Sequence, residues 1–209
     1  MGAKVFGFCG IECYDLIYYA AKTATHLGFS TLLVDLSPTH EMCYLYHDSF
    51  GIGDIVEVNG VSLMGGRLEK GCLSGYEYIF IYYGTKPILM DLCDEFYFVT
   101  DFQKQNIAAL TSVKVPDVPR YLIVRDRGNC SLNYAYILEE VPNLEVDETN
   151  IYPIEDSDED VRAKILLQYS MGVKFSRLSD SIKELIMHIL ETDFSHKDIN
   201  AAWKAIVKG

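Results

Sequence analysis

The first 35 residues alternate between two kinds of secondary structure, and this alternation limits the folds open to the chain. Lys4–Phe8 and Thr31–Asp35 are short apolar runs, and between them Tyr14–Leu27 carries apolar residues at helical spacing. Gly28 stands where a helix would end in the left-handed conformation. A strand, a helix and a strand within so few residues form a βαβ unit, which requires a parallel sheet. We therefore expect an α/β fold.

The same alternation continues along the chain. Further apolar runs suit strands that are buried on both faces, and the segments between them have helical periodicity. We expect strands at 78–83, 95–100, 120–125 and 150–154, and helices at 103–110, 132–140, 158–169 and 178–190. Residues 36–75 follow no clear pattern, and we expect irregular or switch-like structure there. The fold class is thus a mostly parallel sheet flanked by helices on both faces, in one domain over residues 1–192. An amphipathic helical tail over residues 193–209 follows.

Composition narrows the function classes. The net charge of −12 over 209 residues argues against a nucleic-acid partner, which requires clustered Lys and Arg. It also disfavours adhesion of the whole molecule to an anionic membrane. No apolar run approaches the ~20 residues of a membrane helix, and we expect no secretory signal. The six cysteines form no CxxC pair, so we expect reduced thiols in a cytoplasmic protein. A redox pair of Cys9 and Cys13 is the alternative.

The other polar clusters in the sequence fit structural roles. His40 and His47 are seven residues apart, which on one helix is too far for a shared ion, and we expect no metal site. Asp35 and Asp101 follow expected strands and suit a polar rim of the sheet. The acidic run 155–160 suits the start of a helix. We expect no catalytic residue in these clusters.

Three motifs carry a resemblance. A loop at residues 7–20, GFCGIECYDLIYYA, stands between the first strand and the first helix. Residues 32–38, LLVDLSP, follow that helix, and residues 76–82, YEYIFIY, form a later strand. With residues 151–164, these segments resemble the MinD/ParA group of P-loop ATPases over residues 3–191. The resemblance implies the P-loop NTPase fold of that group.

The family's functional residues are mostly replaced. Its loop reads K-G-G-x-G-K-T, and aligned on it the phosphate-binding lysine falls on Cys13 and the magnesium-binding hydroxyl on Tyr14. The signature lysine falls on Phe8, and the Walker B carboxylate falls on Tyr82. Glu12 falls on a glycine. The resemblance implies a vestigial nucleotide site, to which we assign Gly10, Cys13, Tyr14, Asp35 and Arg125.

These replacements bear on phosphate binding. A phosphate loop needs glycine-permitted turns, a lysine and a hydroxyl, and this loop keeps only Gly10. The charge of Glu12 would repel a triphosphate by several kcal/mol in a partly desolvated site, whereas the helix dipole contributes only ~1 kcal/mol. We infer that ordinary ATP hydrolysis is absent and expect no cofactor, with ATP and magnesium as the alternative.

The sequence therefore predicts a pseudo-ATPase that binds proteins. We expect a positioning or scaffold component of a cytoplasmic assembly such as a pilus, secretion or partition system. Its partner would be a second copy or an active family ATPase, with direct contacts through aromatic residues near the loop. These are Tyr14, Tyr18, Tyr19, Tyr44 and Tyr46, which could also be ordinary packing residues. The alternatives are a nucleotide-binding switch or weak ATPase, and a peripheral membrane adaptor acting through residues 195–208.

Overall fold

The computed structural model describes residues 2–46, 48, 50–68, 70–86, 90–125, 131–155, 157–169 and 172–206. Within them eight strands form one sheet, in the order β3-β4-β2-β5-β1-β6-β7-β8. All neighbouring strands are parallel except β3 and β4. The strands are β1 (Lys4–Gly10), β2 (Thr31–Asp35), β3 (Ile55–Val58), β4 (Val61–Gly65), β5 (Tyr78–Tyr82), β6 (Glu95–Thr100), β7 (Arg120–Arg125) and β8 (Ile151–Ile154).

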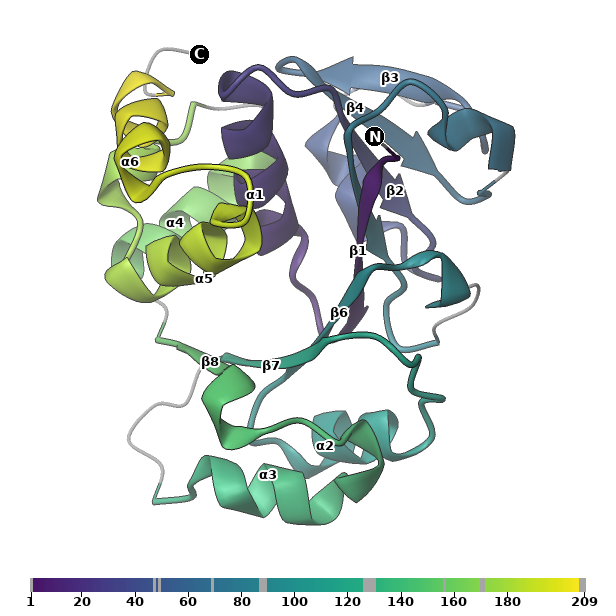
Figure 1. Cartoon of the computed structure of the whole chain (residues 1–209), viewed down its shortest axis with the longest axis vertical. Coiled ribbons are helices and arrows are strands. Elements are labelled where there is room, and N and C mark those ends of the chain that lie inside the picture. Colours follow the sequence, from purple (N-terminus) through teal and green to yellow (C-terminus); the bar gives the residue numbers. More distant parts are fainter. Residues whose placement is uncertain are drawn as a thin grey trace.

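Helices cover both faces of the sheet (Figure 1). On one face lie α1 (Tyr14–His26), α4 (Asp158–Leu167), α5 (Asp180–Leu190) and α6 (His196–Ala205), and on the other lie α2 (Lys104–Thr111) and α3 (Tyr134–Glu140). Short 3-10 turns are η1 (Glu41–Leu45), η2 (Lys70–Leu73), η3 (Met90–Leu92), η4 (Pro142–Leu144), η5 (Glu148–Asn150) and η6 (Phe175–Arg177). This is the expected α/β class.

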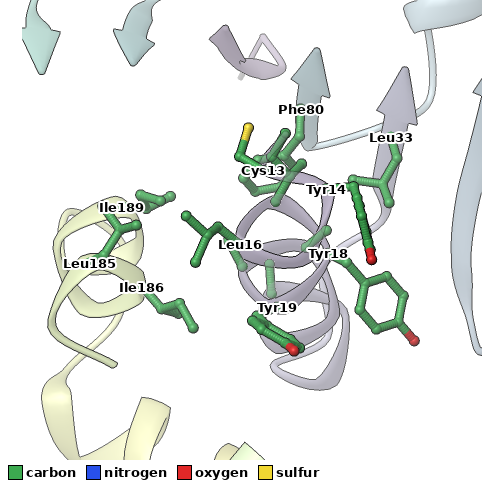
Figure 2. Close-up of a cluster of buried hydrophobic side chains, with 14 of the residues drawn as sticks. Cys13, Tyr14, Leu16, Tyr18, Tyr19, Leu33, Phe80, Leu185, Ile186 and Ile189 are labelled. Carbon is green, nitrogen blue, oxygen red and sulfur yellow. The ribbon is translucent and has the colours of Figure 1, made fainter. Parts of the chain in front are cut away.

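The core follows from the apolar strands. Successive side chains of a strand point to opposite faces, so Phe80 packs with the α1 side while its neighbour Ile81 packs with the α2 side. Helix α1 lies between the sheet and α5, and Figure 2 shows Leu16 of α1 pointing toward Ile189 of α5. Because both of its sides are covered, α1 has a fixed position, and so has the loop before it.

One part of the sequence expectation is wrong. Residues 55–65, within the segment expected to be irregular, form the β3–β4 hairpin. Its turn is Asn59-Gly60, with φ values of 52° and 84°. Two successive residues with positive φ define the type I′ turn, and Asn-Gly between alternating apolar residues is its strongest sequence signal. The hairpin was therefore readable from the sequence.

The C-terminal helix is attached to the domain. The Ser195 side chain accepts a hydrogen bond from the Asp198 amide and caps α6. Trp203 is 3% exposed, and its indole Nε1 donates to Thr23 Oγ1 of α1 at 3.2 Å. The apolar stripe of α6 is therefore turned inward. Among the described helices, none combines the length and the apolar character that crossing a membrane would require.

Candidate functional site

The loop between β1 and α1 lies at the carboxyl ends of parallel strands, where open α/β sheets bind their ligands. We call residues 10–15, together with Arg125 and Tyr82, the loop site. Gly10 ends β1 with a φ of +136°, and a Cβ atom there would lie 1.8 Å from the carbonyl oxygen of Val99. Only glycine fits this approach of two strands.

The first loop amides already have acceptors. The N–H of Gly10 donates to the carbonyl of Gly84 at 2.8 Å, and the N–H of Ile11 donates to the carbonyl of Val99 at 3.0 Å. A phosphate loop directs its successive N–H groups at the anion instead. These two donors are therefore engaged with backbone carbonyls and are not free for a phosphate.

The two positions of the lysine and the hydroxyl are buried. Cys13 is fully buried and precedes α1 without making a side-chain capping hydrogen bond. Burial, followed by the nearby Asp15 carboxylate, holds the pKa of the Cys13 thiol well above its usual value, so the thiol is neutral. Tyr14 is 2% exposed, and its hydroxyl donates to the carbonyl of Lys164 at 3.0 Å. Neither side chain offers a group for the phosphates or the magnesium of a nucleotide.

An ion pair closes the beginning of α1. Nη1 and Nη2 of Arg125 donate to the two carboxylate oxygens of Asp15 at 2.7 and 3.0 Å, and Nη1 also reaches the carbonyl of Glu12 at 3.3 Å. Both side chains are almost completely buried. The carboxylate occupies the first turn, where the helix dipole favours negative charge. The Asp15 carboxylate thus supplies the negative charge that a bound anion would bring to this position, and the Arg125 guanidinium supplies the positive charge that would bind the anion.

A second ion pair links the loop to α4. Lys164 Nζ lies 2.8 Å from Glu12 Oε2, and it stands 5.6 Å from the centre of the Tyr14 ring. The ammonium comes from a different element than the lysine of a phosphate loop. The Lys164 ammonium pairs with Glu12, whose negative charge would repel a triphosphate.

The side chains of Asp35 and Tyr82 form hydrogen bonds with the turn that follows β2. Asp35 is fully buried, its Oδ1 accepts from the amide and hydroxyl of Ser37, and its Oδ2 accepts from the Met42 amide at 2.7 Å. The Tyr82 hydroxyl donates to Glu41 Oε2 at 2.8 Å. Burial is the main cause of the raised pKa of Tyr82, so its side chain is a neutral phenol.

The structure brings most of the sequence-predicted residues together. Gly10, Cys13, Tyr14 and Arg125 meet at the loop, whereas Asp35 lies two strands away, at the end of β2. Their role as a nucleotide remnant stays a prediction. The pairing of Asp15 with Arg125 was not predicted from the sequence. Its only signal was a carboxylate in the first helical turn and an arginine at the end of a strand.

The tyrosines near the loop are mostly core residues. Tyr14, Tyr18 and Tyr19 are at most 3% exposed, so they cannot provide the direct partner contacts considered for them. Tyr44 is 63% exposed. The described cysteines, which are Cys9, Cys13, Cys43, Cys72 and Cys93, are free thiols, so no Cys9–Cys13 disulfide is present. Cys130 and His47 lie outside the described residues.

Comparisons with solved structures place this fold. A ParA family ATPase from Chlorobium tepidum TLS matches with a TM-score of 0.65 and 15% identity, over 90% of this chain and 99% of that one. McdA from Cyanothece, in complex with ATP, matches with a TM-score of 0.62 and 11% identity, over 90% and 96%. The cell division protein MinD from Aquifex aeolicus matches with a TM-score of 0.60 and 12% identity, over 92% and 99%.

The fold is therefore MinD/ParA-like, of the P-loop NTPase type. No protein-family model and no curated protein matches the sequence itself. At such low identities the likeness concerns the arrangement of helices and strands.

Proposed function

We propose that this chain is a non-catalytic MinD/ParA-like domain, a pseudo-ATPase that acts as a protein-binding, positioning or scaffold component. We place it in a cytoplasmic assembly such as a pilus, secretion or partition system. The MinD/ParA-like fold supports the positioning or partition character.

The observation that carries the proposal is the buried pair of Arg125 and Asp15 beneath a loop without lysine. Two charges at 2.7 Å, almost without solvent exposure, stabilise each other only while both remain in place. A phosphate entering the loop would bring further negative charge beside Asp15 and Glu12. It would find neither a lysine nor free amides at Gly10 and Ile11. Nucleotide binding would therefore have to break existing contacts.

A protein partner would be recognised without a bridging nucleotide. We propose a second copy of this chain or an active ATPase of the same fold, joined through direct side-chain contacts. The burial of Tyr14, Tyr18 and Tyr19 leaves Tyr44 as the exposed tyrosine among those considered. The negative net charge disfavours nucleic acid as a partner.

Titration calorimetry with ATP and ADP in the presence of magnesium tests the absence of a nucleotide site. We expect no binding heat at millimolar nucleotide and no change of molar mass in light scattering when ATP is added. Binding in the micromolar range would overturn the proposal.

An ATPase assay needs a control for contaminating enzymes. Asp35→Ala removes the one carboxylate that we assigned to the vestigial nucleotide site, and Asp91→Ala removes an exposed carboxylate elsewhere. We expect any residual turnover to be the same in both variants. Turnover that disappears in Asp35→Ala alone, in a variant that remains folded by circular dichroism, would identify a real ATPase.

A nucleotide-binding switch is the second candidate, and one observation favours it. Cys13, the residue before helix α1, makes no side-chain capping hydrogen bond, so backbone amides at the helix N-terminus would be the donors to an anion, in competition with the Asp15 carboxylate of the first turn. In that case ATP would bind through backbone groups alone and change the oligomeric state. The same calorimetry and light scattering distinguish the two. The membrane adaptor is disfavoured because Ile199 and Trp203 of α6, and Ile206 directly after it, are buried against the domain.

A further inference from the structure

A mixed cluster of side chains lies outside the loop site, around the turn that follows β2. Asp35 ends the strand, His40 precedes η1, and Cys43 lies within η1. A carboxylate oxygen, a ring nitrogen and the sulfur of these residues all lie within 4.8 Å of one another. A carboxylate, an imidazole and a thiol are the three kinds of side chain that bind zinc.

We propose that Asp35, His40 and Cys43 form a binding site for a divalent transition metal, with Zn²⁺ as the ion that the three ligands fit best. The proposal does not depend on the proposed pseudo-ATPase function, because no nucleotide takes part in it. In a tetrahedral zinc site, bond lengths of about 2.0 to 2.3 Å place the ligand atoms roughly 3.3 to 3.8 Å apart. Small side-chain rotations would bring the three atoms to that separation.

The backbone holds the three residues around one point. The Asp35 carboxylate accepts from the amides of Ser37 and Met42, so the turn wraps around it. The Cys43 amide donates to the carbonyl of His40 at 3.1 Å, which fixes the cysteine relative to the histidine. Asp35 Oδ2 accepts one hydrogen bond, and a carboxylate oxygen has room for a second partner. These contacts orient the carboxylate, as hydrogen bonds around metal ligands do.

Two features of His40 point to a missing ligand. Its Nδ1 atom is buried and has no hydrogen-bond partner, although buried polar atoms in folded proteins nearly always have one. Its backbone has a φ of 50°, which is unusual for a residue with a side chain. Such conformations gather at functional positions, where the surrounding structure maintains them. A metal ion would supply the partner that the imidazole lacks.

Two residues of the cluster, His40 and Cys43, line a hollow with room for a further ligand. A pocket of about 460 Å³, which we call the edge pocket, is lined in part by His40, Cys43, Tyr46, Phe50 and Ile52. A Cβ atom on Gly65 would lie 2.8 Å from the Cys43 sulfur, so this glycine leaves room for the thiol. Three protein ligands and an open fourth position are typical of zinc sites that bind water or a small molecule.

Charge and softness favour zinc over hard cations. Zinc binding converts the Cys43 thiol to a thiolate and releases its proton to solvent, because the thiolate is the ligand form. One thiolate and one carboxylate then neutralise the two charges of the ion. Magnesium and calcium prefer oxygen ligands only, and a thiolate excludes them.

Zinc and cobalt titrations of the full chain, freed of metal with a chelator, test the site. We expect one Zn²⁺ per chain by calorimetry, and with Co²⁺ the intense visible bands of a tetrahedral site plus a thiolate-to-cobalt charge-transfer band. Cys43→Ser should abolish that band and weaken zinc binding by roughly 100-fold or more. Cys72→Ser is the matched control, because Cys72 is also a half-buried free thiol but lies outside the cluster, and it should bind like the wild type.

A variant of His40 and a direct measurement of the metal ligands test the site independently of Cys43→Ser. His40→Gln should also lose the affinity, while His196→Gln on α6 should retain it. X-ray absorption of the zinc-loaded wild type should show one sulfur in the metal shell, and this measurement needs no variant to fold. An all-oxygen and nitrogen shell, an unchanged cobalt spectrum in Cys43→Ser, or no stoichiometric binding by the wild type would each overturn the proposal.

Discussion

The loop site and the edge pocket both lie at the carboxyl ends of parallel strands, yet they are built in opposite ways. In the loop site, Arg125 and Lys164 form ion pairs with Asp15 and Glu12, and Cys13 is fully buried. The edge pocket is a hollow beside a buried imidazole nitrogen that lacks a partner. Ile52, which lines it, is 77% exposed.

The comparison of the two regions indicates where a ligand can bind without breaking existing ion pairs or hydrogen bonds. At the loop between β1 and α1, the charged side chains Asp15 and Glu12 are already paired with Arg125 and Lys164. The groups available for a ligand lie beside it, around Asp35. A fold thus fixes where strands end, but the side chains at those ends decide which of them can bind a ligand.

Removal of Arg125 should break the closed loop site most severely. Arg125→Leu leaves the Asp15 carboxylate buried without its partner, and we expect a loss of about 3–5 kcal/mol in the free energy of unfolding, measured with urea. Arg120→Leu is the control, because its ion pair with Glu145 is partly exposed and should contribute less than about 1 kcal/mol.

A double variant separates the charge effect from the packing effect. Asp15→Leu with Arg125→Leu removes both charges, and we expect it to recover much of the lost stability. If Arg125→Leu costs no more than Arg120→Leu, the pair does not hold the loop site closed.

The approach of β1 to β6 gives the next largest effect. Gly10→Ala would place a methyl group 1.8 Å from the Val99 carbonyl oxygen at a φ of +136°. We expect a loss of about 3 kcal/mol or more in the free energy of unfolding. Gly28→Ala has a φ of +100° but open space around the new methyl group, and should cost only about 1 kcal/mol. Equal losses in both variants would mean that the strands can move apart at Gly10.

Much of the fold was predictable because it rests on local patterns. Strands such as Thr31–Asp35 and Glu95–Thr100 are continuous apolar runs, and their bounds agree with the structure. The hairpin around Asn59-Gly60 was missed, although its turn signal is local. It interrupts the βα alternation, and the surrounding glycines hid the short strands.

The site was less predictable because its contacts are long-range. Asp15 and Arg125 are 110 residues apart in the sequence, and no periodic pattern indicates that the two meet. The same holds for Glu12 and Lys164. Asp35, His40 and Cys43 lie close together in the sequence, but their cluster depends on the left-handed backbone conformation of His40. No sequence signal predicts that conformation.

Alkaline pH should weaken the closed loop site through Cys13. Burial raises the pKa of this thiol in the folded state well above the unfolded value of 9.0. The resulting stability is fully present below that unfolded value and declines as pH rises toward the folded pKa, because the unfolded chain loses the proton first. Between about pH 7 and about pH 10 the thiol should therefore account for a loss of about 1.4 kcal/mol.

Urea unfolding of Cys13→Ala at both pH values measures this contribution. The variant is less stable at each pH because it lacks the buried sulfur, but its decline with pH should be smaller than that of the wild type. A decline identical to the wild type would show that the Cys13 thiol is not protected in the folded protein.

The smallest predicted effect concerns the contact that joins the two regions. Tyr82 belongs to the loop site, and its hydroxyl donates to Glu41, the first residue of η1 beside the edge pocket. Tyr82→Phe should cost about 1 kcal/mol, the usual net contribution of such a hydrogen bond. Tyr19→Phe is a close control, because the Tyr19 hydroxyl is equally buried but has no hydrogen-bond partner, so its removal should be neutral or stabilising.

Cobalt binding by Tyr82→Phe tests whether the hydrogen bond from Tyr82 to Glu41 helps to hold His40 and Cys43 in place. Weaker binding in Tyr82→Phe than in Tyr19→Phe would mean that the loop site supports the edge pocket, whereas equal binding would mean that the turn around Asp35 forms the metal site by itself.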